Sequence, residues 1–581
     1  MIGEILEIDK NKVKVKNSNA LDNIINLYVK IYDDKNLFVG EVESLTKEVI
    51  IINLMGEIAN NKFTYGVSKK PSLRYKVDLL NDNEIKVLFN LNTYNPKEKL
   101  YLGKSVLYND YPIYASINNM FANHLVVLGN SGSGKSCGVA RILQNLFYKQ
   151  DAECKNATIF IIDAYGEYKN AFSMINYVHK DLMYKNYTSD LSSDDELIKI
   201  PLWLLSVDDL CLLLEVSNKN QIPIIEKALK LVNVFKREEE DVIKSKNSII
   251  ASSIIDIFIN GKNPAQIRDQ IISVLTMYNT KDLNLDTPIV LPGYTRPLKQ
   301  CLMIDNTGKI RDTELVIKFL QEYVLEELKL DYPDGSYIFT LKDLLYAFDF
   351  ALIDEGMLSN ENVYNLANEL RVKLASIVDS DISKFFEFDN HYTKKDFFTY
   401  LTHVNDTKCQ IINFNLNGID DRLAKVIAKI YSKFLFDYAK CEIERGSVPI
   451  HILLEEAHRY VQRDTDLEFL GYNIFERIAK EGRKYGVLLD LISQRPSELS
   501  QTVLSQCSNF IVFKITHPKD LDYIKPMIPF ISEELIEKIK NLPVGNCLTF
   551  GSLFTIPTIV KVDPASPLPS SNSCDISNTW F

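Results

Sequence analysis

The chain has 581 residues, too many for a single hydrophobic core, and we expect about two to four domains. Its composition, 46% hydrophobic and 25% charged, is that of a soluble globular protein, and no apolar run approaches the ~20 residues of a membrane span. The nine cysteines lack the CxxC spacing of zinc or redox sites, and a net charge of −11 argues against a surface coated for nucleic acid, although a local basic channel is compatible with it.

The N-terminal residues 1–100 read as a set of short strands. The first segment, "MIGEILEIDKNK", is acidic and alternating, unlike a signal or transit peptide, so we expect a cytoplasmic protein. "KVKVKN" alternates at period two, "EVIIINLMGEI" and "EIKVLFNL" are strand-like, and "DKNK" and "NDNE" are turn-like. Because a barrel closes such strands without open edges, these residues predict a small N-terminal β-barrel.

After residue 100 the pattern changes to apolar strands that alternate with longer helices, which predicts a parallel α/β sheet. The strand runs are "HLVVLG", "TIFIID", "CQIINFNL", "IHILLEE", "GVLLDLIS" and "NFIVFKIT". Between Leu423 and Tyr438 the apolar residues follow one face of a helix. We assign residues 101–204 and 401–562 to this α/β core.

Residues 205–400 interrupt the alternation and read as a mostly helical insertion. "TELVIKFLQEYVLEELKL" and "NVYNLANELRVKLASIVD" have helical patterns, and "LPGYTRP" reads as a loop between them. The tail, 563–581, is rich in Pro and Ser and cannot bury a core of its own. It ends in Trp580 and Phe581, and we expect it to brace a neighbouring surface.

The strongest motif is "GNSGSGKS", which fits GxxxxGK[ST] between an apolar strand and a helix with an apolar face. Backbone N–H groups of such a loop curl around phosphate oxygens at a helix N-terminus. Lys135 would reach the β and γ phosphates, and the Ser136 hydroxyl would coordinate Mg²⁺. The sequence therefore predicts an α/β P-loop NTPase core, RecA-like, that binds ATP and Mg²⁺ through Gly129, Asn130, Ser131, Gly132, Ser133, Gly134, Lys135 and Ser136.

The stretch "IHILLEEAHRY" supplies the acids that a P-loop enzyme needs at the end of a second strand. We expect Glu455 to assist the metal and Glu456 to polarise the attacking water. A zinc site is excluded by spacing, since "EEAHR" is not HExxH, and a purely structural role for the two acids is the alternative. His451 reads as a strand residue, whereas His458 reads either as a link to the neighbouring segment or as a polar helix start.

Two further strand ends carry polar candidates. Asp163, after "TIFII", would point toward the same crevice and support Mg²⁺ or the water, or would cap the next helix. Gln494, in "LISQRPSEL", is suited to sensing the γ-phosphate or the water, with a structural role as the alternative.

"ERIAKEGRKYG" carries four basic residues, which in most proteins would form a solvated helix face. In an ATPase ring, an arginine supplied by a neighbouring subunit can neutralise transition-state charge. Arg483 is the first candidate for that role and Arg477 the second.

In this order, "GNSGSGKS", "DAYGEY", "NFNLNGIDDRLAKVIAKI", "ILLEEAHRY", "IAKEGRKYGV" and "SQRPSEL" resemble the HerA family of the HerA/FtsK class of P-loop motors, over essentially the whole chain. The resemblance implies that Lys135, Ser136, Asp163, Glu455, Glu456, Arg483 and Gln494 take the family's active-site roles. The chain departs from the family where an arginine is expected before the histidine that leads into the P-loop strand: Asn123 precedes His124, which leaves that arginine's contribution to a neighbouring site without a counterpart.

The resemblance also implies a homohexamer that uses ATP to translocate duplex DNA. We expect no membrane partner. Such motors work with a docked nuclease or another effector. In bacteria those partners include NurA-like nucleases and sirtuin-like, NAD-consuming effector proteins of antiviral defence. The alternative function is an ATP-regulated ring scaffold that assembles an effector without productive translocation. The polar stretch "QRDTDLEFLGYN" is the candidate for a pore loop.

Overall fold

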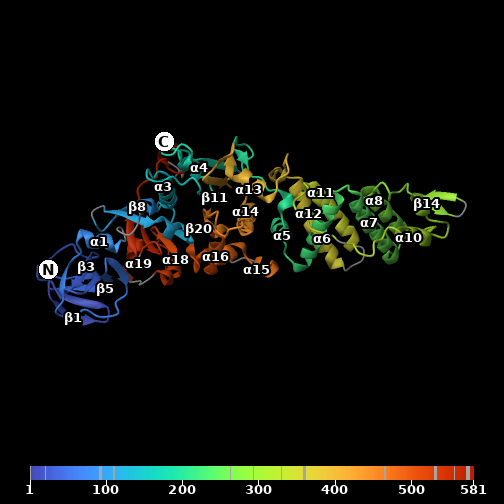
Figure 1. Cartoon of the computed structure of the whole chain (residues 1–581). Helices are drawn as coiled ribbons and strands as arrows, with labels where there is room; N and C mark the ends of the chain where they lie inside the picture. Colours follow the sequence, from blue (N-terminus) through green and yellow to red (C-terminus); the bar gives the residue numbers. More distant parts are fainter. Residues whose placement is uncertain are drawn as a thin grey trace. The chain divides into compact units, whose positions relative to one another are not determined.

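The computed structural model describes the chain except residues 1, 20, 90–94, 109–110, 262, 292–293, 329, 357–360, 463–465, 529–532, 555, 571–575 and 581. It divides into two compact units (Figure 1). Unit 1 comprises residues 1–196, 400–464 and 472–581, and unit 2 comprises residues 197–399 and 465–471. Of the helices in the described residues, none has both the length and the hydropathy of a membrane span.

The N-terminal strands of unit 1 form a seven-stranded antiparallel sheet in the order β1-β2-β5-β4-β3-β7, with β6 paired to β5. An isolated bridge between Gly3 and Val77 joins the two ends of this order, so the predicted barrel is a curled sheet that meets at that pair. Its alternating side chains bury an apolar core of their own. The strands are β1 (Ile5–Asp9), β2 (Lys12–Lys16), β3 (Tyr28–Tyr32), β4 (Leu37–Leu45), β5 (Val49–Ala59), β6 (Lys62–Tyr65) and β7 (Lys76–Leu79).

One predicted strand of this region is wrong. "EIKVLFNL" and the turn before it contribute to a helix, α1 (Asp82–Leu88). A capping box starts the helix, because the Asn81 side chain accepts from the Glu84 N–H while the Glu84 carboxylate accepts from the Asn81 N–H. Ile85 and Leu88, three residues apart, bury one face. The local cap outweighs the β-branched composition that suggested a strand.

The core of unit 1 is a twelve-stranded sheet in the order β13-β12-β18-β11-β19-β20-β10-β21-β22-β23-β8-β9. Strands β12 to β21 of this order are parallel and the rest beyond β21 are antiparallel. The predicted apolar runs are its central strands, completely buried as expected for a sheet covered on both faces. The strands are β8 (Lys99–Ser105), β9 (Pro112–Ser116), β10 (Leu125–Leu128), β11 (Ile159–Asp163), β12 (Tyr184–Thr188), β13 (Glu196–Leu197), β18 (Ile411–Asn415), β19 (Ile450–Leu454), β20 (Val487–Ser493), β21 (Asn509–Val512), β22 (Asn546–Gly551) and β23 (Thr558–Lys561).

Helices of unit 1 accompany this sheet (Figure 1). The helix predicted between Leu423 and Tyr438 is confirmed as α14, whose first turn is capped by the Asp420 side chain. Besides α1 and α14 (Asp421–Cys441), these helices are α2 (Ile117–Phe121), α3 (Lys135–Phe147), α4 (Tyr168–Phe172), α16 (Ile474–Tyr485), α17 (Gln501–Leu504), α18 (Pro518–Ile524), α19 (Glu533–Lys540) and α20 (Ile576–Trp580), with a small hairpin of β16 (His403–Val404) and β17 (Thr407–Lys408).

Unit 2 is mostly helical and comprises residues 197–399 and 465–471, whereas the predicted insertion is 205–400. "LPGYTRP" is not a plain loop, since its described ends belong to a hairpin of β14 (Pro288–Leu291) and β15 (Tyr294–Pro297). The helix predicted from Thr313 ends at Gln321, earlier than the pattern suggested. The helices are α5 (Val207–Leu213), α6 (Ile222–Phe235), α7 (Glu240–Asn260), α8 (Pro264–Met277), α9 (Leu298–Cys301), α10 (Thr313–Gln321), α11 (Leu341–Gly356), α12 (Glu361–Val378), α15 (Asp466–Phe469) and α13 (Lys394–Thr402), which runs to the boundary with unit 1.

The tail lies against unit 1. Ser566 N–H donates to the Gln144 side chain of α3 at 2.8 Å, and the Asn170 amide of α4 donates to the Leu568 carbonyl at 2.9 Å. Trp580 is 74% exposed, and Phe581 lies outside the described residues. The surface that the tail contacts up to residue 570 is therefore that of its own chain.

Candidate nucleotide-binding and hydrolysis site

The GxxxxGKS segment forms a loop between β10 and α3. Gly132 and Gly134 have left-handed backbones, with φ of 72° and 96°, which only glycine adopts without strain. A Cβ on Gly134 would lie 3.0 Å from the Gly545 nitrogen. The loop therefore turns tightly into the N-terminus of α3, where unpaired N–H groups and the helix dipole favour phosphate.

Lys135 is 5% exposed and points back into its own loop, where Nζ donates to the Asn130 carbonyl at 3.3 Å. Burial lowers the pKa of Lys135, and the carboxylates of Glu456, Glu455 and Glu167 oppose that shift. The charges of three acids thus act on one buried ammonium. This balance of charge marks the place where the phosphates of a nucleotide and a divalent cation would enter.

Glu455 follows β19 directly and is buried. Its Oε2 accepts a 2.7 Å hydrogen bond from the Tyr168 hydroxyl, and its Oε1 lies 3.5 Å from the Ser136 hydroxyl. Burial raises the pKa of Glu455 to about 8, with the Tyr168 bond acting in the opposite direction. The two residues expected at the metal, Ser136 and Glu455, therefore lie side by side although 319 positions separate them.

These side chains fit Mg²⁺. Hydroxyl and carboxylate oxygens are the donors that Mg²⁺ takes in nucleotide sites, where substrate phosphates and water complete its shell. Glu456 Oε2 and Glu167 Oε2 are buried with no hydrogen-bond partner among the described residues. Buried carboxylate oxygens left without partners are costly unless a cation or water satisfies them.

Glu456 has a left-handed backbone, φ 50° and ψ 47°, which is strained for a residue with a side chain. The turn directs the carboxylate away from the Glu455 position and toward the end of the next strand. There the Gln494 amide donates to Glu456 Oε1, and His458 Nδ1 lies 3.2 Å from Oε2. The two adjacent acids therefore have different neighbours, as their predicted roles require.

Gln494 bridges the phosphate loop and Glu456. Its carbonyl oxygen accepts from the Ser131 hydroxyl, while its amide nitrogen donates to Glu456. His458 Nδ1 also lies 3.2 Å from the Ser493 hydroxyl, so it links the "EEAH" turn to the end of β20. A side chain that touches both the loop and the acid can report the presence of a γ-phosphate to Glu456.

Asp163 ends β11, next to β19, and is completely buried. Its Oδ1 accepts from the Glu167 N–H at 3.0 Å and its Oδ2 from the Tyr168 N–H at 2.9 Å. Asn413 adds a third donor at 3.3 Å. These contacts hold the turn that leads into α4, and the direct role at metal or water remains a prediction.

Arg483 is exposed near the end of α16, immediately before β20 begins. The phosphate loop follows the C-terminal ends of the parallel strands, which lie on the other side of the sheet from the N-terminal end of β20. At about 3.3 Å per residue, the seven residues of β20 separate these edges by about 20 Å. Arg483 therefore lies too far away to serve the site of its own chain.

His451 and His124 make structural contacts. His451 Nδ1 pairs with Asp490 at 2.8 Å inside the sheet, far from the site end of β19. His124 is buried: its Nδ1 accepts from the Leu489 N–H and its Nε2 donates to the Ala479 carbonyl of α16. Asn123, in the place of the expected arginine, donates to the Asn119 carbonyl at 2.9 Å.

Sequence analysis missed Glu167 and Tyr168. Both lie in "DAYGEY", in which only Asp163 was singled out. The available signal was a second acid four residues after the strand-end aspartate, beyond a glycine turn. Part of the candidate pore loop, residues 463–465, lies outside the described residues.

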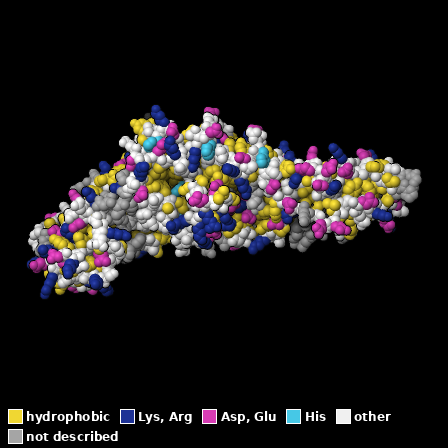
Figure 2. All heavy atoms as spheres, in the orientation of Figure 1, with side chains coloured by type: hydrophobic (Ala, Val, Ile, Leu, Met, Phe, Trp, Pro, Cys, Tyr) yellow, Lys and Arg dark blue, Asp and Glu magenta, His cyan; other side chains and the backbone are white. Residues whose placement is uncertain are grey.

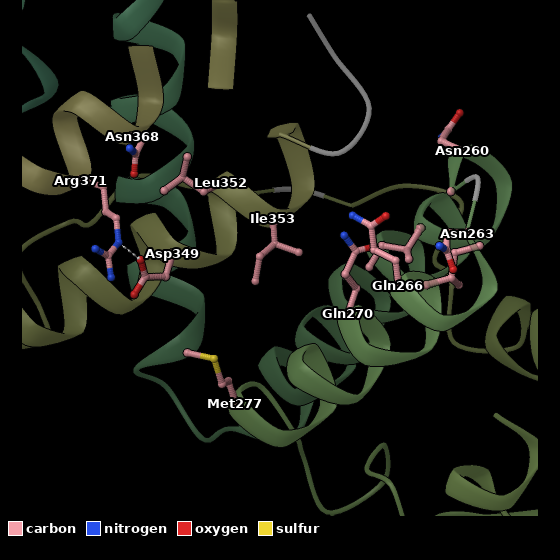
Figure 3. A pocket seen from close by; sticks show the side chains of 13 residues that line it. Asn260, Asn263, Gln266, Gln270, Met277, Asp349, Leu352, Ile353, Asn368 and Arg371 are labelled. Carbon is pink, nitrogen blue, oxygen red and sulfur yellow. Dashed lines mark hydrogen bonds and ion pairs between the residues drawn. The ribbon is translucent and has the colours of Figure 1, made fainter. Parts of the chain in front are cut away.

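Unit 2 holds a separate cavity of about 880 Å³, shown in Figure 3. Its lining is rich in amides from α7, α8, α12 and the turn between α7 and α8, and includes the ion pair of Arg371 with Asp349 at 2.6 Å. This amide-rich lining differs from the site in unit 1, which combines a glycine-rich phosphate loop with acidic side chains. The nucleotide site is therefore assigned to unit 1.

Comparison with known proteins agrees with this assignment. The family model described as "Helicase HerA, central domain" matches residues 100–289. The probable DNA double-strand break repair helicase HerA of Methanocaldococcus jannaschii is 24% identical over 574 residues, which cover 98% of this chain and 93% of that protein. The chain is thus similar to HerA helicases over nearly its whole length.

A second relative, the DNA double-strand break repair helicase HerA of Sulfolobus acidocaldarius, is 31% identical over 207 residues, covering 35% of this chain and 41% of that protein. Among solved structures, the plasmid coupling protein TrwB in complex with a GTP analogue has a TM-score of 0.43 at 9% identity, covering 85% of this chain and 95% of that one. That TM-score is too low to support a functional statement. By its P-loop site and its similarity to HerA helicases, the chain is an ATPase.

Proposed function

We propose that the protein is a homohexameric motor that hydrolyses ATP to translocate duplex DNA, and that it works with a nuclease or an NAD-consuming effector. The observation that carries the motor is the link from Ser131 through Gln494 to Glu456, which couples the phosphate loop to the acid placed for hydrolysis. The names of the HerA relatives, repair helicases acting on DNA breaks, support DNA as the track.

The residues divide the hydrolysis between them. Lys135 would contact the β and γ phosphates, and Ser136 with Glu455 would hold Mg²⁺. When bound, Mg²⁺ neutralises charge on the phosphates during transfer. Glu456 would accept hydrogen bonding from the attacking water, while Gln494 fixes the direction of that carboxylate. Asp163 supports this arrangement by holding the segment that carries Glu167 and Tyr168.

The placement of Arg483 supports a ring. Subunits related by rotation in a closed ring present one face to the opposite face of the next subunit. Arg483 lies at the sheet edge opposite its own phosphate loop, so such an arrangement would bring it to a neighbour's nucleotide. Arg477, the second candidate, pairs with Glu481 at 3.9 Å and lies two turns earlier on α16.

A local basic surface supports DNA binding by an acidic protein. In Figure 2, Lys and Arg side chains gather over the area that α16 occupies in Figure 1. Arg477, Lys480 and Lys484 recur at helical spacing on α16. Since phosphate contacts depend on the contacting face, the net charge of −11 is compatible with this surface.

The effector is proposed from the family resemblance: a NurA-like nuclease or a sirtuin-like, NAD-consuming protein, in DNA processing or antiviral defence. The competing function is a ring scaffold that ATP only switches or stabilises. The acidic composition favours it mildly. In that case effector activity would survive Lys135→Ala as long as the ring forms, whereas a motor-driven effector would lose it.

The test is ATP hydrolysis with and without duplex DNA in the wild type and in Glu456→Gln. A motor predicts DNA-stimulated hydrolysis that Glu456→Gln abolishes while ATP binding persists, because the glutamine fills the same space without a carboxylate. The matched control is Glu498→Gln, an acid nearby on the surface that pairs with Arg495. Hydrolysis indifferent to DNA, alone and with the partner, would contradict the motor.

A further inference from the structure

The segment from Asp163 to Tyr168, here called the acid arm, is built as a fixed loop. The buried Asp163 carboxylate holds the N–H groups of Glu167 and Tyr168 at 3.0 and 2.9 Å. Gly166 makes the turn with φ 73°, and a Cβ there would meet the Asn415 side chain at 2.8 Å. Since both Asp163 oxygens are used by this backbone, the carboxylate anchors the arm.

The arm is also held from behind. The Glu167 carbonyl accepts from the Ser570 N–H of the tail at 2.8 Å. The buried Gln144 of α3 donates to the Ala171 carbonyl at 2.8 Å and to the Pro567 carbonyl at 2.9 Å. A single side chain of α3 is thus bonded both to α4, the helix that continues the arm, and to the tail.

Tyr168 reaches from the arm to the metal-side acid. Its ring is completely buried and stacks on Phe172 at 5.9 Å between centroids. Its hydroxyl donates to Glu455 Oε2 at 2.7 Å, which leaves Oε1 on the side of Ser136. A buried hydroxyl with one short bond to a carboxylate fixes the direction of that carboxylate.

Glu167 brings a third carboxylate to the phosphate loop. Burial raises the pKa of Glu167, while a hydrogen bond from the Ser136 side chain and the charge of Lys135 lower it. Its Oε2 is buried without a hydrogen-bond partner among the residues that the structure describes. The side chain therefore bonds to the residue expected at Mg²⁺, and one of its oxygens is left unsatisfied.

We propose that the acid arm is a second half of the Mg²⁺-nucleotide site, in which Glu167 contacts the hydrated metal and Tyr168 is a positioning residue for Glu455. This proposal rests on the ATPase site of the proposed function and does not depend on DNA translocation. Two consequences follow from charge and geometry. Glu167 repels a nucleotide that arrives without Mg²⁺. Tyr168 orients Glu455 toward the metal, so its hydroxyl affects nucleotide binding in the presence of Mg²⁺ and not in its absence.

The experiment measures binding of a fluorescent, non-hydrolysable ATP analogue in EDTA and over a Mg²⁺ titration, without DNA. Tyr168→Phe keeps the ring and removes only the hydroxyl, so affinity in EDTA stays within about twofold while the Mg²⁺ concentration for half-saturation rises about tenfold. Glu167→Gln removes one negative charge near the phosphates. It raises the affinity in EDTA about fivefold and reduces the gain from Mg²⁺.

The matched control is Tyr187→Phe. Tyr187 is also completely buried, but its hydroxyl donates to the Tyr400 carbonyl at 3.1 Å, away from the site. The control should bind like the wild type at every Mg²⁺ concentration. Equal shifts in Tyr187→Phe and Tyr168→Phe would overturn the proposal, because the effect would then be general loosening.

Wild-type curves for both Tyr168→Phe and Glu167→Gln would also overturn it, since the arm would then be only structural. If Tyr168→Phe fails to fold, Glu167→Gln alone decides through its affinity in EDTA. A protein that binds Mg²⁺-nucleotide as predicted but hydrolyses it indifferently to DNA would refute the proposed motor and leave the acid arm standing.

Discussion

Replacement of Gln494 by alanine tests the link between the phosphate loop and the catalytic acid. The change removes two hydrogen bonds at once: one accepted from the neutral Ser131 hydroxyl and one donated to the Glu456 carboxylate. The Glu456 carboxylate then retains the contact of its Oε2 with His458 Nδ1 at 3.2 Å and loses the partner of its Oε1. Glu456 should therefore sample directions that do not face the water.

The size of the effect follows from the two bonds. A neutral hydrogen bond contributes about 0.5–1.5 kcal/mol and one to a charged group about 1.5–3 kcal/mol. Gln494 is half-buried, so we take about 2 kcal/mol, near the lower limit of the sum. If this loss falls on the transition state, kcat decreases about 30-fold.

The assay is steady-state ATP hydrolysis, with nucleotide affinity measured separately. We expect kcat to fall while the affinity changes by less than about threefold, because the Lys135 contact with the phosphates is left intact. Arg495→Ala is the control, since Arg495 is the next residue but points to Glu498 on the surface. A Gln494→Ala enzyme with wild-type kcat, or one that loses only affinity, would refute the proposed link.

Two further predictions concern residues away from the phosphate loop. Arg483→Ala should lose hydrolysis and keep nucleotide binding. Mixing it with Glu456→Gln subunits should restore part of the activity, because one kind of subunit retains the acid and the other retains the arginine. Complete absence of rescue would contradict action in trans. His124 is buried as a neutral imidazole with its pKa lowered to about 4 from the ordinary 6.5. As the pH falls, this histidine is protonated in the unfolded protein before it is protonated in the folded protein. The contribution to the free energy of unfolding is therefore fully present above pH 6.5 and is lost as the pH falls toward 4, by about 2 kcal/mol at pH 5. Denaturant unfolding at pH 7 and 5 measures this loss, which His124→Gln should diminish; an equal loss in both proteins would exclude His124 as its source.

The sequence was sufficient for the parts of the site that depend on local pattern. The glycine spacing around Lys135 requires the same loop in any fold, and a strand that ends in Glu455 and Glu456 places both acids at the phosphate edge of a parallel sheet. The helix of residues 421–441 followed from its apolar face and the Asp420 cap. These features are decided within about twenty residues of chain.

The parts that sequence could not decide depend on contacts between distant segments. Whether Asp163 faces the metal or turns back to the Glu167 and Tyr168 N–H groups depends on the turn at Gly166. Tyr168 meets Glu455 across 287 positions, and nothing near either residue announces the pairing. The strand predicted at "EIKVLFNL" was wrong for a different reason. Its apolar residues fit the period of a strand and that of a helix, and the Asn81–Glu84 capping box favours the helix.

The measurement that tests the central proposal most directly is the rate of ATP hydrolysis as duplex DNA is added to the assembled protein at constant Mg²⁺. The proposal predicts a rate that rises with DNA length and saturates, and that Glu456→Gln removes without loss of ATP binding. A rate that duplex DNA leaves unchanged, with and without the effector, would contradict a DNA-translocating motor and would favour the scaffold.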